Sequence, residues 1–161
     1  MEKNFTIREA TVEDVDHIFR FINELAEYEE MTDLVVATPE KLKQSIFDEG
    51  YAKVIMGLEG DTPVGFALYF FNYSTFEGRP GLYLEDLFIT EAHRGKGYGT
   101  AMLKKLAEIA VEKDCKRYEW VCLDWNKPAL NLYKSLGAVP KDEWVILRLD
   151  GENLTEMGQK E

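Results

Sequence analysis

The sequence predicts an α/β fold, in which a mixed β-sheet carries helices on both faces. The local patterns run in the order strand, two helices, three strands, helix, strand, helix, strand. Meandering strands followed by alternating units indicate a sheet with antiparallel and parallel neighbours. A glycine-rich turn joins the strand at 82–89 to a long helix. The 161 residues contain no long linker, so we expect one domain, residues 1–161.

The first strand and the first helix follow from local patterns. Residues 5–8 alternate apolar and polar side chains, which predicts a strand. Thr11 begins a helix, with Asp14 three residues later as a variant capping box. Apolar residues then recur at helical spacing and predict the buried stripe: Val15, Ile18, Phe19, Ile22, Leu25 and Ala26.

The second helix begins at Thr38, which is followed by a proline in the first turn, and Gly50 ends it. Its apolar face consists of Leu42, Ile46 and Phe47. Residues 54–58 and 64–71 form a hairpin around the turn at 59–61.

The C-terminal half alternates strands and helices. A strand at 82–89 precedes a helix at about 97–113, and a further strand covers 118–123. Asn126 caps a short helix that Gly137 terminates, and residues 144–149 are expected to form the last strand.

Charge narrows the class of partner. Lys and Arg number 19 and Asp and Glu number 30, so the net charge is −11. A field of that sign repels nucleic acid and anionic membranes, so we expect neither as a partner. Solubility alone and attraction of a cationic substrate both remain explanations of the acidity. No apolar run approaches the roughly 18 residues that span a membrane, and residues 1–4 show no signal-peptide pattern, so we expect a cytoplasmic protein.

The glycine-rich turn has the features of a phosphate-binding loop. The first turn of a helix leaves N–H groups unpaired and carries positive partial charge, so phosphates bind there. Alternating glycines let the backbone approach an anion, and two cations add charge. The spacing is neither that of a P-loop nor that of a dinucleotide fingerprint. A glycine-rich turn without a ligand is the other explanation. The loop comprises Arg94, Gly95, Lys96, Gly97, Tyr98, Gly99 and Thr100.

This loop resembles the acetyl-CoA loop of the GNAT N-acetyltransferases, and the resemblance covers nearly the whole chain. Within that superfamily the sequence is most similar to the spermidine/spermine (diamine) N-acetyltransferases. The matching segments are residues 24–29, residues 83–88, and residues 125–128 together with Tyr133 and Lys134. The resemblance implies the GNAT fold, a central, mostly antiparallel sheet with a splayed pair of parallel strands.

The resemblance also implies a cofactor site for acetyl-CoA. The loop at 94–100 would hold the pyrophosphate. Leu87, Phe88 and Ile89 would offer backbone groups to the pantetheine arm, and one of their N–H groups would stabilise the oxyanion. The sulfur end would be lined by Asn126, Lys127, Pro128 and Ala129.

Two side chains are candidates for proton transfer. An aliphatic amine has a pKa of about 10, so it arrives protonated and must lose a proton before attack. Glu85 at the splay is expected to bind the ammonium and take that proton, directly or through water. By resemblance, Tyr133 donates a proton to the leaving thiolate. The alternatives are a solvated carboxylate and an aromatic packed on the sheet.

The end of the first helix is rich in acids, which the helix dipole disfavours there. A solvated face or a cationic acceptor explains this placement. The residues that the resemblance assigns to the acceptor are Tyr28, Glu29, Glu85, Glu119, Trp120 and Val121. Glu30 stands where better-known members of the family carry an aromatic, which leaves the length of the amine open.

The leading hypothesis is therefore transfer of acetyl to a primary amine of a small polyamine or diamine in a ternary complex. A thialysine-like amino acid or a protein amine is the alternative acceptor, and a non-catalytic acyl-CoA sensor is a third hypothesis. A homodimer is expected from the family. Cys115 and Cys122 are expected to pack, and His17 and His93 to lie on the surface, so no metal is expected.

Overall fold

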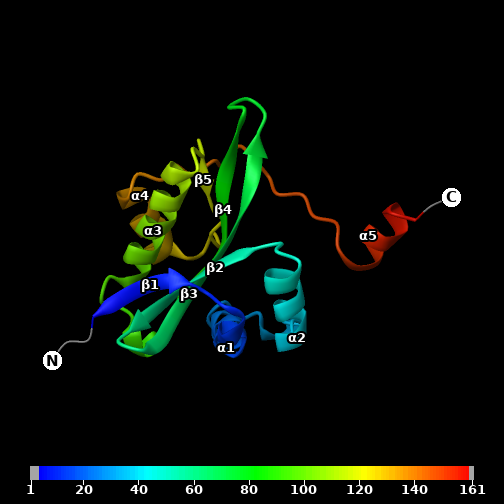
Figure 1. The fold of residues 1–161 in the computed structure, drawn as a ribbon. Helices are drawn as coiled ribbons and strands as arrows, with labels where there is room; N and C mark the ends of the chain where they lie inside the picture. Colours follow the sequence, from blue (N-terminus) through cyan, green and yellow to red (C-terminus); the bar gives the residue numbers. More distant parts are fainter. Residues whose placement is uncertain (1–3, 160–161) are drawn as a thin grey trace. The chain divides into compact units, whose positions relative to one another are not determined.

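The computed structural model describes residues 4–159 (Figure 1), and the chain divides into two compact units between Val121 and Cys122. The expectation of no signal peptide rests partly on residues 1–3, which lie outside the described residues. The first unit contains the sheet and the second contains α4 and α5. No helix among residues 4–159 is both long and apolar enough to cross a bilayer.

The first unit is built on a five-stranded sheet of order β1-β2-β3-β4-β5. Its strands are β1 (Phe5–Glu9), β2 (Lys53–Glu59), β3 (Thr62–Ser74), β4 (Arg79–Ile89) and β5 (Tyr118–Glu119). The first four pair antiparallel, and β4 pairs with β5 in parallel. The predicted mixed sheet is therefore confirmed.

One face of the sheet is covered by α1 (Val15–Tyr28) and α2 (Pro39–Leu42), and α2 continues as a π-helical turn, Lys43–Asp48 (Figure 1). The core beneath these helices combines Ile18 and Phe21 with Met56 and Phe66 of the strands. The predicted stripe omitted Phe21, which is fully buried, whereas Phe19 is only half-buried. Phe21 stacks on Phe66 with ring centroids 5.9 Å apart, a contact between distant segments that helical spacing does not reveal.

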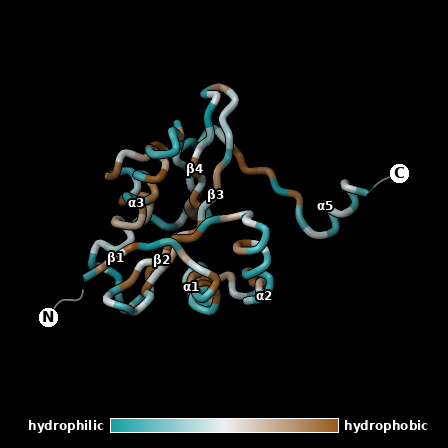
Figure 2. Tube along the Cα trace, in the orientation of Figure 1, coloured by the Kyte–Doolittle hydropathy of each residue, from teal (hydrophilic) through white to brown (hydrophobic). Residues whose placement is uncertain are grey.

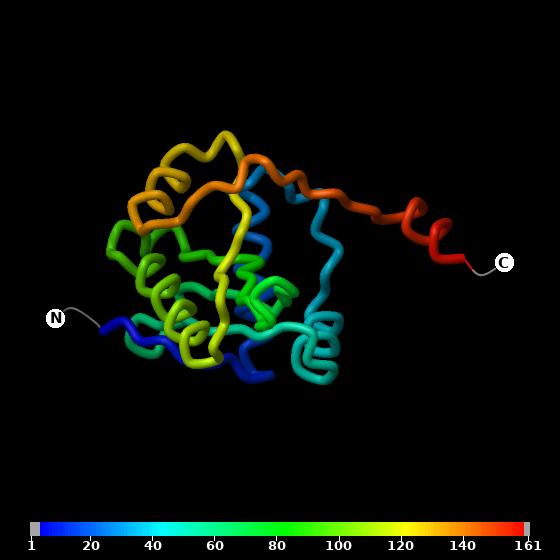
Figure 3. Tube along the Cα trace, turned by 90° about the horizontal axis from the view of Figure 1, so that it is seen from above, coloured from blue at the N-terminus to red at the C-terminus, as the bar shows by residue number. Residues whose placement is uncertain are grey.

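The other face is covered by α3 (Tyr98–Glu112), which lies close to β1 (Figures 1 and 3). Met102 and Leu106 are fully buried. A Cβ on Gly57 would lie 2.8 Å from the Phe5 ring and 3.3 Å from Met102 Sδ, so only glycine allows α3 to approach β2 this closely. Helices thus cover both faces, as predicted.

The helix starts follow the predicted capping. Thr38 Oγ1 accepts the Lys41 N–H at 3.2 Å, and Asp14 Oδ2 accepts the Thr11 N–H at 2.8 Å. In the second unit Asn126 Oδ1 accepts the Ala129 N–H at 3.4 Å at the start of α4 (Lys127–Ser135). Gly137 follows α4 with a φ of +99°, and the Ala138 N–H bonds to the Tyr133 carbonyl at 3.1 Å, as in a Schellman ending.

Two predictions about the C-terminal strands are wrong, the first in its length and the second entirely. The strand expected at 118–123 has only two paired residues, Tyr118 and Glu119. Residues 144–149 form no strand, because no strand of residues 4–159 supplies a ladder for them. Their apolar run, brown in Figure 2, is exposed, with Leu147 at 91%. The short helix α5 (Gly151–Met157) follows and was not predicted.

Candidate active site

The glycine-rich loop lies between the short helical turn Glu91–His93 and α3. Gly95 and Gly97 have φ values of +78° and +82°, and no atom lies within 4 Å of a Cβ built on either. Within residues 4–159 the N–H groups of Gly95, Gly97 and Gly99 donate to no backbone carbonyl. An anion can bind at a helix N-terminus where there is open space and where backbone N–H groups make no other hydrogen bond.

Arg94 connects this loop to the end of α1. Its Nε donates to the Ile89 carbonyl at 2.9 Å. Its guanidinium lies 5.0 Å from the ring centroids of both Tyr28 and Phe88. The structure thus brings Tyr28, assigned to the acceptor, beside a residue assigned to the cofactor.

The cationic side chain of Lys96 already forms an ion pair with a carboxylate of the protein. Lys96 Nζ lies 3.1 Å from Glu59 Oε2, and the Tyr98 hydroxyl donates to the same oxygen. Sequence reasoning missed Glu59, because it precedes Lys96 by 37 residues and belongs to no motif.

The pairing of β4 with β5 stops before β4 ends. Leu82 pairs with Tyr118 and Tyr83 with Glu119, and no further pair follows. From Leu84 to Ile89, β4 pairs only with β3. Phe88 and Ile89 bury their side chains, so they can offer only backbone groups to a ligand at this open edge. The register therefore shows the splay that the resemblance implied.

Glu85 occupies a β-bulge at the start of this open edge. Asp86 pairs with Leu68 and Leu84 with Tyr69, so Glu85 is the extra residue of β4. A bulge redirects the side chain of the inserted residue, and Glu85 is exposed. The position suits a carboxylate that must reach an incoming amine.

Three carboxylates interact near this bulge. Burial raises the pKa of Asp86 to about 6, and the negative charges of Glu85 and Glu29 contribute to this rise. Burial also raises the pKa of Glu29. Like charges held together in a partly desolvated site attract a cation. Asp86 was missed as a site residue, although its adjacency to Glu85 in the sequence was a usable signal.

The acceptor residues assigned to the end of β5 and the two residues after it lie in the first unit. Glu119 lies 3.9 Å from Arg117, measured from Oε1 to Nε, and the Trp120 ring packs on Tyr118 at 4.8 Å between centroids. Val121 is 57% exposed. Glu119 therefore has a cation beside it already, which weakens its assignment to an ammonium.

The remaining predicted residues belong to the second unit. Asn126 holds the first turn of α4, and Lys127, Pro128 and Ala129 make up that turn. Tyr133 lies further along α4 and is half-buried. The structure thus groups these residues on one helix, as the sequence predicted.

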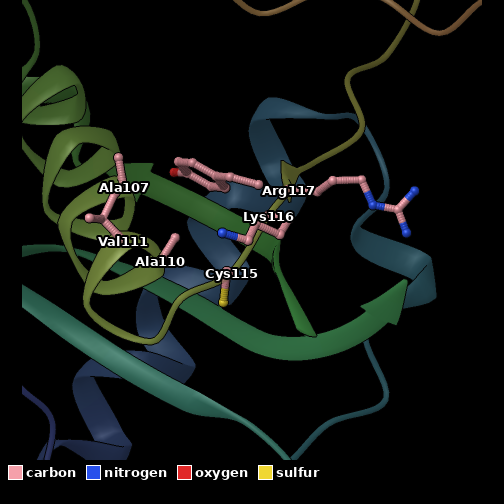
Figure 4. A pocket seen from close by; sticks show the side chains of 7 residues that line it. Ala107, Ala110, Val111, Cys115, Lys116 and Arg117 are labelled. Carbon is pink, nitrogen blue, oxygen red and sulfur yellow. The ribbon is translucent and has the colours of Figure 1, made fainter. Parts of the chain in front are cut away.

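A groove at the C-terminal end of α3 contains none of the predicted site residues (Figure 4). It is lined by Ala107, Ala110, Val111, Cys115, Lys116, Arg117 and Tyr118. Burial raises the pKa of the Cys115 thiol, so the thiol is protonated and unreactive at neutral pH. Among residues 4–159 no group of three His, Cys, Asp or Glu side chains is suited to a metal ion.

Comparison with known proteins agrees with this geometry. Residues 13–138 match the acetyltransferase (GNAT) family. A thialysine N-ε-acetyltransferase of Bos taurus is 40% identical over 96% of this chain and 97% of its own. A human spermidine/spermine N(1)-acetyltransferase-like protein 1 is 34% identical over 98% of this chain and 24% of its own.

The fold is also found among solved structures. An integron cassette protein from the mobile metagenome of V. cholerae superposes with a TM-score of 0.81 and 28% identity, covering 97% of this chain and 98% of its own. The family match extends from the start of the first helical region to the residues just after α4, and it includes the glycine loop, the bulge and Tyr133. The chain is therefore a member of the GNAT acetyltransferase family, whose co-substrate is acetyl-CoA.

Proposed function

We propose that this protein transfers acetyl from acetyl-CoA to the terminal primary amine of a thialysine-like amino acid. The observation that carries the proposal is the group of Glu29, Glu85 and Asp86 in the unit that holds the open glycine loop. A thialysine-like molecule carries two ammonium groups and one carboxylate, so its side-chain ammonium suits this group. The thialysine N-ε-acetyltransferase, 40% identical over nearly both full lengths, supports this acceptor.

In the proposed donor site, N–H groups of residues 95–100 receive the diphosphate and the open edge of β4 pairs with the pantetheine arm. The acetyl carbonyl then lies near residues 87–89, and one of their N–H groups, at the open edge of β4, stabilises the negative charge of the tetrahedral intermediate. Asn126 to Ala129 line the sulfur end. No acyl-enzyme forms, because the amine attacks the thioester directly in a ternary complex.

Glu85 accepts the proton that the ammonium must lose, directly or through one water. Its place in the bulge and its exposure support this role. Tyr133 donates a proton to the departing thiolate of coenzyme A. Each proton transfer contributes roughly 10²–10⁴-fold to the rate.

A polyamine is the second candidate, and the acidity of the protein favours it. The net charge of −11 and the acids that end α1 suit a polycation better than a molecule with its own carboxylate. The human relative named for spermidine and spermine is 34% identical, and this chain covers 24% of its length. The lower identity places this acceptor second.

One experiment separates these acceptors. The protein is mixed with acetyl-CoA and a panel of thialysine, lysine, ornithine, spermidine and putrescine, and free thiol is measured. We expect kcat/KM to be highest for thialysine. A preference for spermidine over thialysine would make a polyamine the acceptor and would contradict the thialysine-like acceptor. Tight binding of acetyl-CoA without thiol release in the presence of any of these amines would indicate a sensor.

We also propose that the protein acts as a homodimer in the cytoplasm, with both units in one catalytic domain. The apolar run at 144–149 joins no strand among residues 4–159, and we propose that a second copy of the chain packs against it. Light scattering of the full chain should give twice the 18.6 kDa of the monomer. Ile146→Glu should shift that mass toward the monomer, and an unchanged mass would contradict a role of this segment.

A further inference from the structure

Glu59, at the end of β2, interacts with three side chains of the segment around the glycine loop. Its Oε2 accepts a hydrogen bond from the Tyr98 hydroxyl and lies 3.1 Å from Lys96 Nζ. Its Oε1 lies 3.9 Å from His93 Nε2. The Glu59 side chain is only 16% exposed, and its backbone pairs with both β1 and β3. The loop is thus connected to the end of β2, inside the sheet.

These contacts fall on alternate residues around the glycines. Lys96 and Tyr98 flank Gly97, and both direct their side chains to the same carboxylate. The Tyr98 ring also stacks on Phe5, with centroids 4.0 Å apart and planes 7° apart. Gly95 and Gly97 have φ values near +80° in this structure, but glycine can adopt many other backbone conformations at little cost. Anchoring both neighbours of Gly97 therefore restricts the loop where its N–H groups must face a ligand.

The same contacts change the role of Lys96. Hydrogen bonds from Tyr98 and Lys96 hold the pKa of Glu59 below its usual range, so Glu59 is ionised at neutral pH. The charge of Lys96 is then matched by a carboxylate of the protein itself. Attraction of a diphosphate depends on the loop N–H groups and on Arg94, while Lys96 serves to hold the loop.

We propose that Glu59 is a positioning residue for acetyl-CoA, which fixes the glycine loop in its diphosphate-binding conformation through Lys96 and Tyr98. This inference rests on the proposed function only in its choice of acetyl-CoA as the ligand. Pre-formed sites bind more tightly because they lose less conformational entropy on binding. Removal of the anchor should weaken the binding of acetyl-CoA and leave the chemical step unchanged.

The test compares Glu59→Ala and Glu59→Gln with the matched variants Asp61→Ala and Asp61→Asn. Asp61 lies two residues further along, in the turn that follows β2, and is exposed, so its variants remove the same charge without the anchor. We expect Glu59→Ala to raise the Kd and KM of acetyl-CoA about five- to tenfold, with kcat within about twofold. Glu59→Gln keeps an oxygen that accepts from Tyr98, so it should remain within about threefold of the wild type. The Asp61 variants should match the wild type.

S-acetyl-pantetheine, which lacks the diphosphate, separates positioning from a general loss of structure. Its kcat/KM should be the same for Glu59→Ala and the wild type. An equal loss with both donors would overturn the inference, as would tighter binding of acetyl-CoA by both Glu59 variants, because that result would make Glu59 a repulsive charge. A wild type that binds no acetyl-CoA would contradict the proposed function itself.

A double-mutant cycle with Tyr98→Phe gives an independent test. This variant keeps the ring that stacks on Phe5 and removes the hydroxyl that donates to Glu59. If the two residues act as one anchor, the double variant should bind acetyl-CoA no more weakly than Glu59→Ala alone. Fully additive losses would contradict a shared anchor.

Discussion

The guanidinium of Arg94 lies 5.0 Å from the ring centroid of Tyr28 and, at the same distance, from that of Phe88. Tyr28 is the last residue of α1, whereas Arg94 begins the glycine loop. The end of α1 that we propose to bind the acceptor is therefore connected to the glycine loop through the Arg94 guanidinium, which contacts both rings. A substitution of Tyr28 should therefore change the affinity for acetyl-CoA.

Tyr28→Ala should raise the KM of acetyl-CoA by about two- to fivefold, the equivalent of an exposed cation–π contact of about 0.5–1 kcal/mol. Tyr28→Phe keeps the ring and should leave that KM unchanged. Steady-state kinetics at saturating acceptor measure both, with Tyr51→Ala as a control at an exposed tyrosine. Equal KM values for Tyr28→Ala and the wild type would show that Arg94 is held without the ring.

Asp86 makes folding stability depend on pH. Its folded pKa of about 6 exceeds the ordinary aspartate pKa of 3.8, so the folded protein binds the proton more tightly than the unfolded chain does. Its contribution to stability is full below about pH 4 and is lost as the pH rises through about 6. The Asp86→Asn side chain does not ionise, so the variant does not lose stability as the pH rises. It should therefore be more stable than the wild type by up to about 3 kcal/mol at a pH of about 7.5.

Urea unfolding at about pH 4 and about pH 7.5 measures this difference. The advantage of Asp86→Asn should shrink toward zero at the lower pH, where the wild-type carboxyl is protonated. Asp16→Asn removes an exposed acid of α1 and serves as the control. A pH-independent difference between Asp86→Asn and the wild type would contradict a raised pKa.

The loop glycines give a prediction that separates strain from binding. Gly97 and Gly50 both have positive φ values, +82° and +72°, and open space surrounds the position that a Cβ would take at either. Alanine at either position adds backbone strain of about 1–2 kcal/mol. Both variants should therefore lose similar stability in thermal unfolding.

Binding should differ between the two variants. Gly97→Ala should weaken the binding of acetyl-CoA at least about tenfold, because the loop must leave its left-handed conformation to relieve the strain. Gly50 follows the π-helical turn after α2, far along the chain from the loop, so Gly50→Ala should keep the wild-type Kd. Calorimetric titration of both with acetyl-CoA checks this, and equal Kd values would remove Gly97 from the cofactor site.

Much of the fold was predictable because its signals are local. The caps at Thr38 and Asn126 and the endings at Gly50 and Gly137 follow from short-range chemistry, and the structure confirms them. The wrong prediction at 144–149 shows where local signals are insufficient. An apolar pattern indicates that a segment will be buried, but it does not indicate which other segment will pack against it.

The candidate site likewise has parts that local sequence signals predict and parts that they do not. The glycine loop and Glu85 could be found from motifs, since each belongs to a contiguous stretch of the sequence. The contact of Glu59 with Lys96 and the burial that raises the pKa of Asp86 could not, because each depends on segments brought together only by the sheet. Resemblance alone predicted a role for Tyr133, and the structure adds that it lies on the helix that Asn126 caps.

In the proposed mechanism Tyr133 donates a proton and Glu85 accepts one, so the pH dependence of the rate tests both roles. Tyr133→Phe should lower kcat at least about tenfold with little change in the Kd of acetyl-CoA, because the leaving thiolate loses its proton donor. Glu85→Gln should lower kcat/KM for the amine most strongly below the amine pKa, where the acceptor must still be deprotonated. Raising the pH should partly restore Glu85→Gln and should not restore Tyr133→Phe. A pH–rate profile of the three proteins between about pH 6.5 and 10 checks this contrast, and parallel profiles for the two variants would contradict separate roles.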